Sequence, residues 1–211
     1  MHGLIFITQE SEKYSHVESA ELALRGGCRL IQLRMKNTPL AEIEDTARVL
    51  KTLCDTYNAY LFIDDHVEIC KSVNAAGVHV GKNDMPPADA RKVLGETFII
   101  GGTANTFDDI VNLYRAGVNY IGLGPFRFTE TKKNLSPLLG LEGYAKKLQQ
   151  SKEQSIVLPI FAIGGIVQSD IPALMRTGVA GIALSGAIVQ AHNPVEKTQQ
   201  IIHEINRWNG K

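Results

Sequence analysis

The sequence predicts an α/β protein that forms a (β/α)8 (TIM) barrel in a single compact domain over residues 1–211. Three observations lead to this prediction. A pattern of helix-like segment, glycine and apolar run recurs, for example as NAAGVHVG and RAGVNYIGLG. The apolar runs are continuous rather than alternating, which is typical of strands buried on both faces of a parallel sheet. Eight such runs alternate with helical stretches, as in a barrel of eight strand–helix units.

The expected strands follow the chain in order at residues 4–8, 29–33, 60–64, 77–80, 98–102, 120–123, 157–163 and 181–184. The clearest amphipathic helices between them span residues 17–24, 40–56 and 106–116. Glycine just past a helix turns the chain towards the next strand, because it adopts the left-handed conformation at little cost. The alternative is an open doubly wound sheet, but no GxGxxG follows the first strand and the sequence contains no P-loop.

The composition argues against several functional classes. The 22 basic and 22 acidic residues give a net charge of zero, whereas general nucleic-acid or anionic-membrane binders carry a basic excess. The three cysteines show no CxxC spacing, which argues against a disulfide framework and a zinc site and favours a reducing, cytoplasmic setting. We expect no signal peptide and no membrane span, since no apolar run approaches the ~20 residues required. The oligomeric state stays open, with a homo-oligomer among the alternatives.

Polar residues follow the expected strands at their carboxyl ends, where barrels of this kind place the active site. In chain order they are Gln32, Arg34, Lys36, Asp64, Asp65, His66, Asp84, Thr103, Asn105, Thr129, Thr131, Lys132 and Lys133. Cations and hydroxyls beside carboxylates predict a magnesium–diphosphate site, because magnesium commonly takes one or two carboxylates plus phosphate oxygens. The alternative is that Lys132 and Lys133 form a solvated charge run while the acids pair with nearby bases.

The last two expected strands end in the glycine turns Gly164-Gly165 and Ser185-Gly186. Exposed N–H groups at such turns bind a phosphomonoester in many barrels, although the turns could also serve only to reverse the chain. The histidines show no HxH or HExxH spacing and no GxSxG elbow occurs, so a zinc site and a protein nucleophile both lack support.

Six segments of the chain resemble the thiamine-phosphate synthase (thiamine-phosphate pyrophosphorylase) family, in the family's order. They are QLRMK, FIDDHVEI, GVHVGKND, GGTANT, GLGPFRFTETK and IGGI. The resemblance covers almost the whole chain, and GLGPFRFTETK is its most specific part. It implies a (β/α)8 barrel that joins a pyrimidine methyl diphosphate to a thiazole phosphate, with or without a carboxylate on the thiazole. The products would be thiamine phosphate and diphosphate.

The resemblance also implies a role for each matching residue. Arg34, Lys36, Thr129, Thr131 and Lys132 would hold the diphosphate, with the three cations as the catalytic charges. Asp65 and Asp84 would bind Mg²⁺. Gly165, Ser185 and Gly186 would bind the thiazole phosphate, and Gln32 would face the pyrimidine.

The sequence departs from the family pattern at several of these positions. Asp64 replaces Asn and adds negative charge at a substrate-binding position, where it would either become a metal ligand or weaken binding. Thr103 replaces Ser at another substrate-binding position and keeps the hydroxyl. His66 replaces an acid, and Asn105 replaces His.

The turn Ser185-Gly186 also departs from the family's Val/Ile-Ser pair, and two alternatives to the synthase interpretation stay open. The Ser185-Gly186 turn is also similar to the sister family, the thiazole tautomerase. That enzyme relies on a His where this chain has Asn105, and an amide cannot act as a general acid or base near neutral pH. The second alternative is a homologue that binds thiazole phosphate without turnover.

Overall fold

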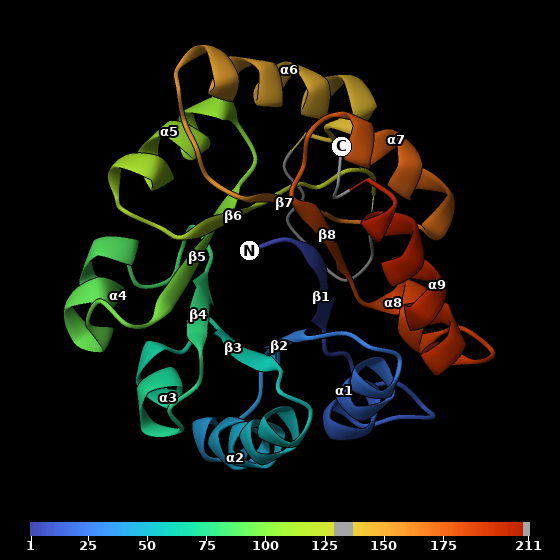
Figure 1. Ribbon diagram of the computed structural model, residues 1–211. Helices are drawn as coiled ribbons and strands as arrows, with labels where there is room; N and C mark the ends of the chain where they lie inside the picture. Colours follow the sequence, from blue (N-terminus) through green and yellow to red (C-terminus); the bar gives the residue numbers. More distant parts are fainter. Residues whose placement is uncertain (129–136, 209–211) are drawn as a thin grey trace.

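The computed structural model describes residues 1–128 and 137–208. Parallel strands form a closed barrel in sequence order, and helices surround it (Figure 1), so the predicted fold is confirmed. The strands are β1 (Gly3–Ile7), β2 (Leu30–Leu33), β3 (Tyr60–Asp64), β4 (Gly77–Val80), β5 (Ile99–Ala104), β6 (Tyr120–Leu123), β7 (Ile160–Ile163) and β8 (Gly181–Leu184).

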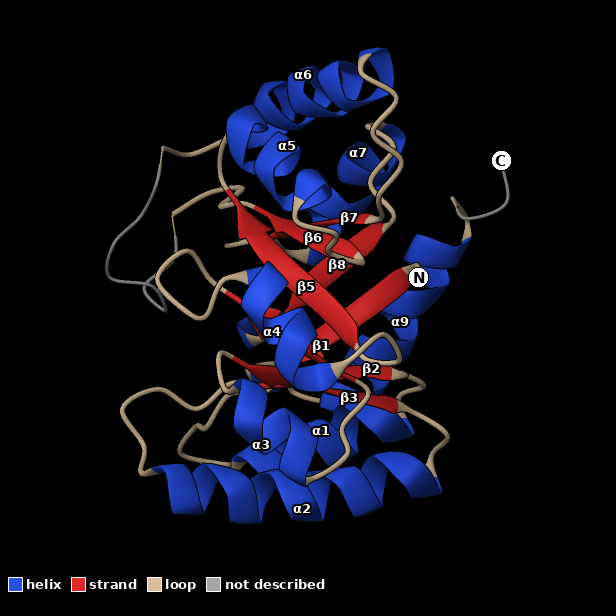
Figure 2. Cartoon of the chain, turned by 90° about the vertical axis from the view of Figure 1, so that its left-hand side faces the viewer, coloured by secondary structure: helices blue, strands red, loops and turns tan. Residues whose placement is uncertain are grey.

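The helices form the outer layer of the barrel. They are α1 (His16–Arg25), α2 (Leu40–Thr56), α3 (Val67–Ser72), α4 (Pro87–Leu94), α5 (Phe107–Arg115), α6 (Gly140–Glu153), η1 (Gln168–Asp170), α7 (Ile171–Arg176), α8 (Gly186–Val189) and α9 (Pro194–Asn206). From the side, the strands lie between α5, α6 and α7 above and α1, α2 and α3 below (Figure 2). Within the two described ranges, no helix has the length and apolar character to cross a membrane.

Several boundaries differ from the sequence prediction by one to three residues, and three of these differences have a clear local reason. Thr106 caps α5 rather than starting it, since its hydroxyl accepts the N–H of Asp109 at 3.1 Å. β5 continues to Ala104, so Thr103 lies in the strand and not after it. β7 begins only at Ile160, because Pro159 has no N–H for the sheet and Val157 is 86% exposed.

The barrel interior is filled by side chains that alternate along the strands. They are Ile5, Ile7, Leu30, Phe62, Tyr120, Phe161 and Ala183. The Tyr120 ring lies edge-on to Phe62 and Phe161 at 5.8 Å in each case. Gly101 makes room for it, because a Cβ there would lie 2.1 Å from the Tyr120 ring. The period of two along a strand then places Gln32 and Asp64 on the same inner face as Leu30 and Phe62.

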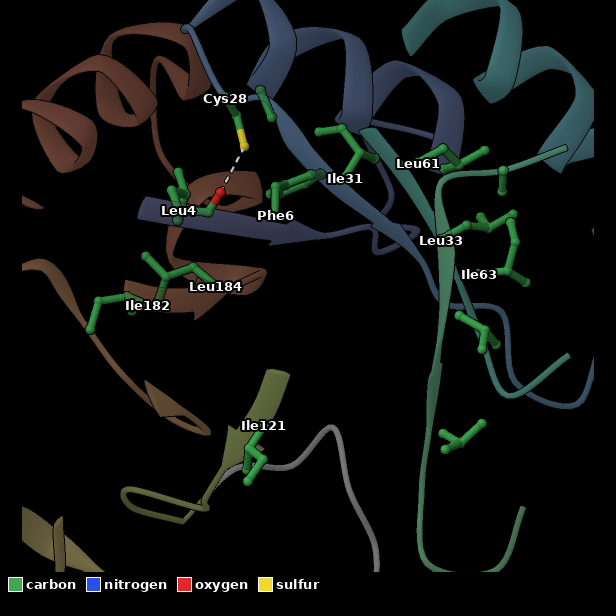
Figure 3. Packing of buried hydrophobic residues seen from close by; sticks show 14 of the residues in the cluster. Leu4, Phe6, Cys28, Ile31, Leu33, Leu61, Ile63, Ile121, Ile182 and Leu184 are labelled. Atoms are coloured by element: carbon green, nitrogen blue, oxygen red, sulfur yellow. Dashed lines mark hydrogen bonds between the residues drawn. The ribbon is translucent and has the colours of Figure 1, made fainter. Parts of the chain in front are cut away.

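The second part of the core lies between the strands and the helices (Figure 3). Leu4, Phe6, Ile31 and Leu33 point outwards here, and each buried Leu or Ile contributes roughly 1.5–3 kcal/mol. The Cys28 thiol donates to the Leu4 carbonyl oxygen at 3.4 Å. All three cysteines are free and buried, so they serve as small core side chains.

Candidate active site

A buried carboxylate organises the carboxyl ends of β2 and β3. Asp64 is 8% exposed, and its Oδ1 accepts a hydrogen bond from Gln32 Nε2 at 2.7 Å. Its other oxygen, Oδ2, lies 3.5 Å from Arg34 Nε and 3.4 Å from Lys36 Nζ. The residues predicted from the sequence to follow these two strands therefore meet around a single side chain.

The charges of this cluster support one another. Burial alone would lower the pKa of Lys36, but the attraction of Asp64 and Asp65 outweighs burial and raises it. Lys36 therefore stays charged at neutral pH. Arg34 is held by its backbone as well, because its N–H donates to the Thr8 hydroxyl at 3.2 Å.

Two further carboxylates, Asp65 and Asp84, lie next to each other. Asp65 has a left-handed backbone (φ 66°), its N–H donates to the His79 carbonyl oxygen at 2.8 Å, and its carboxylate accepts a hydrogen bond from Lys36. Asp84 accepts the N–H of Gly81 at 2.7 Å. Burial and then the neighbouring Asp65 carboxylate raise the pKa of Asp84. The structure thus brings together the two acids that the sequence predicted as metal ligands.

The chemistry of this acid pair fits magnesium. Among residues 1–128 and 137–208, no group of three or more His, Cys, Asp or Glu side chains is placed to hold a metal ion. A cation at Asp65 and Asp84 would therefore complete its shell with water or substrate oxygens. That is the usual arrangement for Mg²⁺, which binds through one or two carboxylates plus phosphates.

Thr103 takes part in a chain of polar contacts that runs into the barrel. Its hydroxyl lies 3.0 Å from His79 Nε2, and His79 Nδ1 lies 3.1 Å from the Tyr120 hydroxyl. The sequence predicted a role for Thr103 but gave none to His79. The histidine therefore orients the threonine hydroxyl. Because the two residues lie on different strands, sequence spacing alone does not reveal this contact.

Asn105 is buried and supports the backbone. Its side-chain amide donates to the Gly124 carbonyl oxygen at 2.6 Å, at the start of the segment that follows β6. Its N–H donates to Asp109 at 2.9 Å, and Lys82 Nζ lies 2.7 Å from the same carboxylate oxygen. Burial would raise the pKa of Asp109, but the hydrogen bonds from Lys82 and the backbone outweigh it and lower that pKa.

The glycine turn after β7 packs closely on the segment after β6. Gly164 and Gly165 have φ values of 96° and 67°, a conformation that favours glycine. A Cβ on Gly164 would lie 2.7 Å from Pro125 Cβ, and a Cβ on Gly165 would lie 2.5 Å from Arg127 Cγ. Both the backbone conformation and the space therefore require glycine at this turn.

The turn after β8 includes a contact that the sequence prediction missed. The Ser185 hydroxyl donates to Gln9 Oε1 at 2.9 Å, and Gly186 begins α8 directly after it. Gln9 directly follows the expected strand at residues 4–8, so the strand-end argument would have found it. The sequence-predicted residues Thr129, Thr131, Lys132 and Lys133 lie outside the described residues.

The sequence matches the family described as thiamine monophosphate synthase over residues 4–188. The chain belongs to the thiamine monophosphate synthase family. It is 57% identical over 203 residues to the thiamine-phosphate synthase of Bacteroides thetaiotaomicron, which covers 96% of this chain and 97% of that protein. It is 45% identical over 204 residues to that of Flavobacterium psychrophilum, which covers 97% of each.

Solved structures agree with membership of the thiamine monophosphate synthase family. The thiamine phosphate pyrophosphorylase from Pyrococcus furiosus has a TM-score of 0.86 and 31% identity, covering 99% of this chain and 97% of the other. A Bacteroides thetaiotaomicron protein of the same description has a TM-score of 0.66 at 14% identity, covering 99% and 98%, and supports the fold alone.

Proposed function

We propose that the protein condenses a pyrimidine methyl diphosphate with a thiazole phosphate to form thiamine phosphate and diphosphate. Membership of the family supports this reaction. The observation that carries the proposal is the grouping of Gln32, Arg34 and Lys36 around Asp64, beside the acid pair Asp65 and Asp84. Cations next to adjacent carboxylates suit a diphosphate whose charge is shared with a divalent metal.

The cations act on the departing diphosphate. As the C–O bond breaks, the electron pair and the growing negative charge move to the leaving oxygen. Fixed charges on Arg34 and Lys36 stabilise that charge more than they stabilise the ground state, which lowers the barrier. The thiazole nitrogen then donates its electron pair to the pyrimidine methylene carbon and forms the new C–N bond. No protein nucleophile takes part in this scheme.

Mg²⁺ belongs to this proposal together with its residues. Asp65 and Asp84 would hold the ion, and when bound it supplies positive charge to the diphosphate oxygens. Lys36 contacts the Asp65 carboxylate, so the same lysine orients a metal ligand and faces the leaving group.

The second substrate binds at the opposite side of the barrel mouth. Backbone N–H groups at Gly165 and at the Ser185-Gly186 turn bind its phosphate, while Gln32 and Thr103 face the pyrimidine. Anchoring both substrates brings the reacting atoms together and reduces the entropy cost of the encounter.

The three free, buried cysteines fit the reducing cytoplasm, which we infer as the site of the reaction.

The test mixes the protein with the pyrimidine diphosphate, the thiazole phosphate and Mg²⁺ and measures thiamine phosphate by chromatography. Each component is omitted in turn as a control. Thiamine phosphate that appears only in the complete mixture supports the proposal. Binding of thiazole phosphate in a calorimeter without any turnover would instead identify a binding homologue.

A further inference from the structure

Arg127 joins two segments that are far apart in the sequence. It lies in the segment after β6, and its Nη1 and Nη2 atoms donate to the two carboxylate oxygens of Asp170 at 2.5 and 2.8 Å. Nη1 also donates to the Gly165 carbonyl oxygen at 2.9 Å. The guanidinium therefore contacts the glycine turn directly and, through Asp170, the beginning of the helix that follows it.

Asp170 is held on both sides of this contact. Its Oδ2 accepts the N–H of Val167 at 2.8 Å, so the carboxylate also closes the turn that leads into α7. Burial would raise the pKa of Asp170, but hydrogen bonds from Arg127 and Val167 lower it. Arg127 and Asp170 thus form a charged pair that fixes the backbone from Gly165 to Asp170.

The other side of Arg127 is anchored to the barrel. Its guanidinium lies 4.8 Å from the centre of the Phe126 ring, and that ring packs edge-on against Tyr144 at 5.9 Å. The Tyr144 hydroxyl in turn accepts the N–H of Ile163 at 3.2 Å. The backbone adds a parallel connection, because the N–H of Arg127 donates to the Gly164 carbonyl oxygen at 3.1 Å.

We propose that Arg127 and Asp170 are positioning residues that hold the Gly164-Gly165 turn in the conformation that binds the phosphate of the second substrate. This inference rests on the proposed function of that turn. An exposed ion pair contributes little to stability by itself, and the Arg127 side chain is 45% exposed. A bidentate pair with an additional carbonyl contact, however, defines geometry, and lysine cannot reproduce its planar fork. The effect therefore falls on binding at the turn.

The experiment compares Arg127→Gln, Arg127→Lys, Asp170→Asn and the Arg127→Gln/Asp170→Asn double variant with the full wild-type chain. We expect each single variant to raise KM for the thiazole phosphate roughly tenfold. KM for the pyrimidine diphosphate should change less than twofold. The double variant should be no worse than the single variants, since both remove the same contact. Arg48→Lys is the matched control, because Arg48 pairs with Glu44 on α2, away from either turn.

Hydrogen exchange provides a readout that needs no substrate. In peptides that cover residues 163–170, Arg127→Gln should speed amide exchange several-fold, while Arg48→Lys leaves it unchanged. Unchanged exchange, or an unchanged KM for the thiazole phosphate, would overturn the proposal. A parallel rise of both KM values with a lower melting temperature would also overturn it, because the pair would then act on stability alone. If the wild-type protein makes no thiamine phosphate, the proposed function is contradicted. The hydrogen-exchange result would then still show whether Arg127 holds the turn in place.

Discussion

The two sides of the barrel mouth are built in different ways. The charged half consists of side chains at the ends of β2, β3 and β4: Gln32, Arg34, Lys36, Asp64, Asp65 and Asp84. The glycine half consists of the turns after β7 and β8. At the turn after β7, the positive φ values of Gly164 and Gly165 and their close contacts with the segment after β6 set the shape. A substitution can remove one charge from the charged half without changing its shape, so we expect it to slow the chemical step. The turn after β7 instead leaves no room for a Cβ on Gly164 or Gly165, so we expect a larger side chain there to weaken binding.

The largest expected effect separates the two halves by their dependence on metal. Treatment with EDTA should reduce turnover roughly a thousandfold, because a divalent cation supplies several kcal/mol of charge stabilisation. Binding of the thiazole phosphate alone, measured by calorimetry, should be retained. Activity that returns with added Mg²⁺ is the control. Full turnover in EDTA would remove Asp65 and Asp84 from their proposed role.

Removal of a cation from the charged half should have the next largest effect. Arg34→Ala should lower kcat about a hundredfold, the usual cost of losing a group that stabilises transition-state charge. The variant should fold normally, because Arg34 is partly exposed at the barrel mouth. Arg48→Ala on α2 is the control for loss of an arginine. A near-normal kcat for Arg34→Ala would rule out this residue as part of the diphosphate site.

An added methyl group tests the glycine half. Gly165→Ala should raise KM for the thiazole phosphate more than tenfold, because a Cβ there would lie 2.5 Å from Arg127 Cγ at φ 67°. Gly117→Ala is a matched control, since Gly117 has a similar φ of 73° but nothing within 4 Å of its Cβ position. The strain of a positive φ alone would lower the melting temperature of both variants by a similar amount. Only a shape effect at the turn changes KM in the first variant and not in the second.

The fold could be predicted from the sequence because its signal is repeated. Continuous apolar runs recur along the chain, several of them after glycine, and β3, β4, β6 and β8 begin and end where expected. The errors arose where local chemistry outweighs hydrophobicity. Pro159 delays β7, and the apolar run at residues 98–102 gives no sign that β5 continues through Thr103. Contacts between strands, which decide such ends, do not appear in a single sequence.

The sequence predicted the site correctly where its residues lie at or just after the end of an expected strand. Gln32, Arg34, Lys36, Asp64 and Asp65 come together as expected. Contacts between residues of neighbouring strands, or of the turns that follow them, were missed, such as His79 to Thr103 and Ser185 to Gln9. Arg127 was overlooked for the same reason, since its partner Asp170 is 43 residues away in the sequence.

The smallest expected effect concerns Asp64. The sequence alone left open whether this carboxylate binds the metal or weakens binding of the diphosphate. Its carboxylate contacts both Arg34 and Lys36, so in the proposed site it would compete with diphosphate for the same cations. Asp64→Asn keeps an oxygen that can accept from Gln32 but removes the charge. KM for the pyrimidine diphosphate should therefore fall two- to fivefold, with stronger inhibition by diphosphate, as expected for partly screened charges. Asp55→Asn, which disrupts an exposed pair with Lys51 on α2, is the matched control. A higher KM in Asp64→Asn would mean that Asp64 acts mainly by positioning Arg34 and Lys36, so that the charged half depends on geometry as much as the glycine half does.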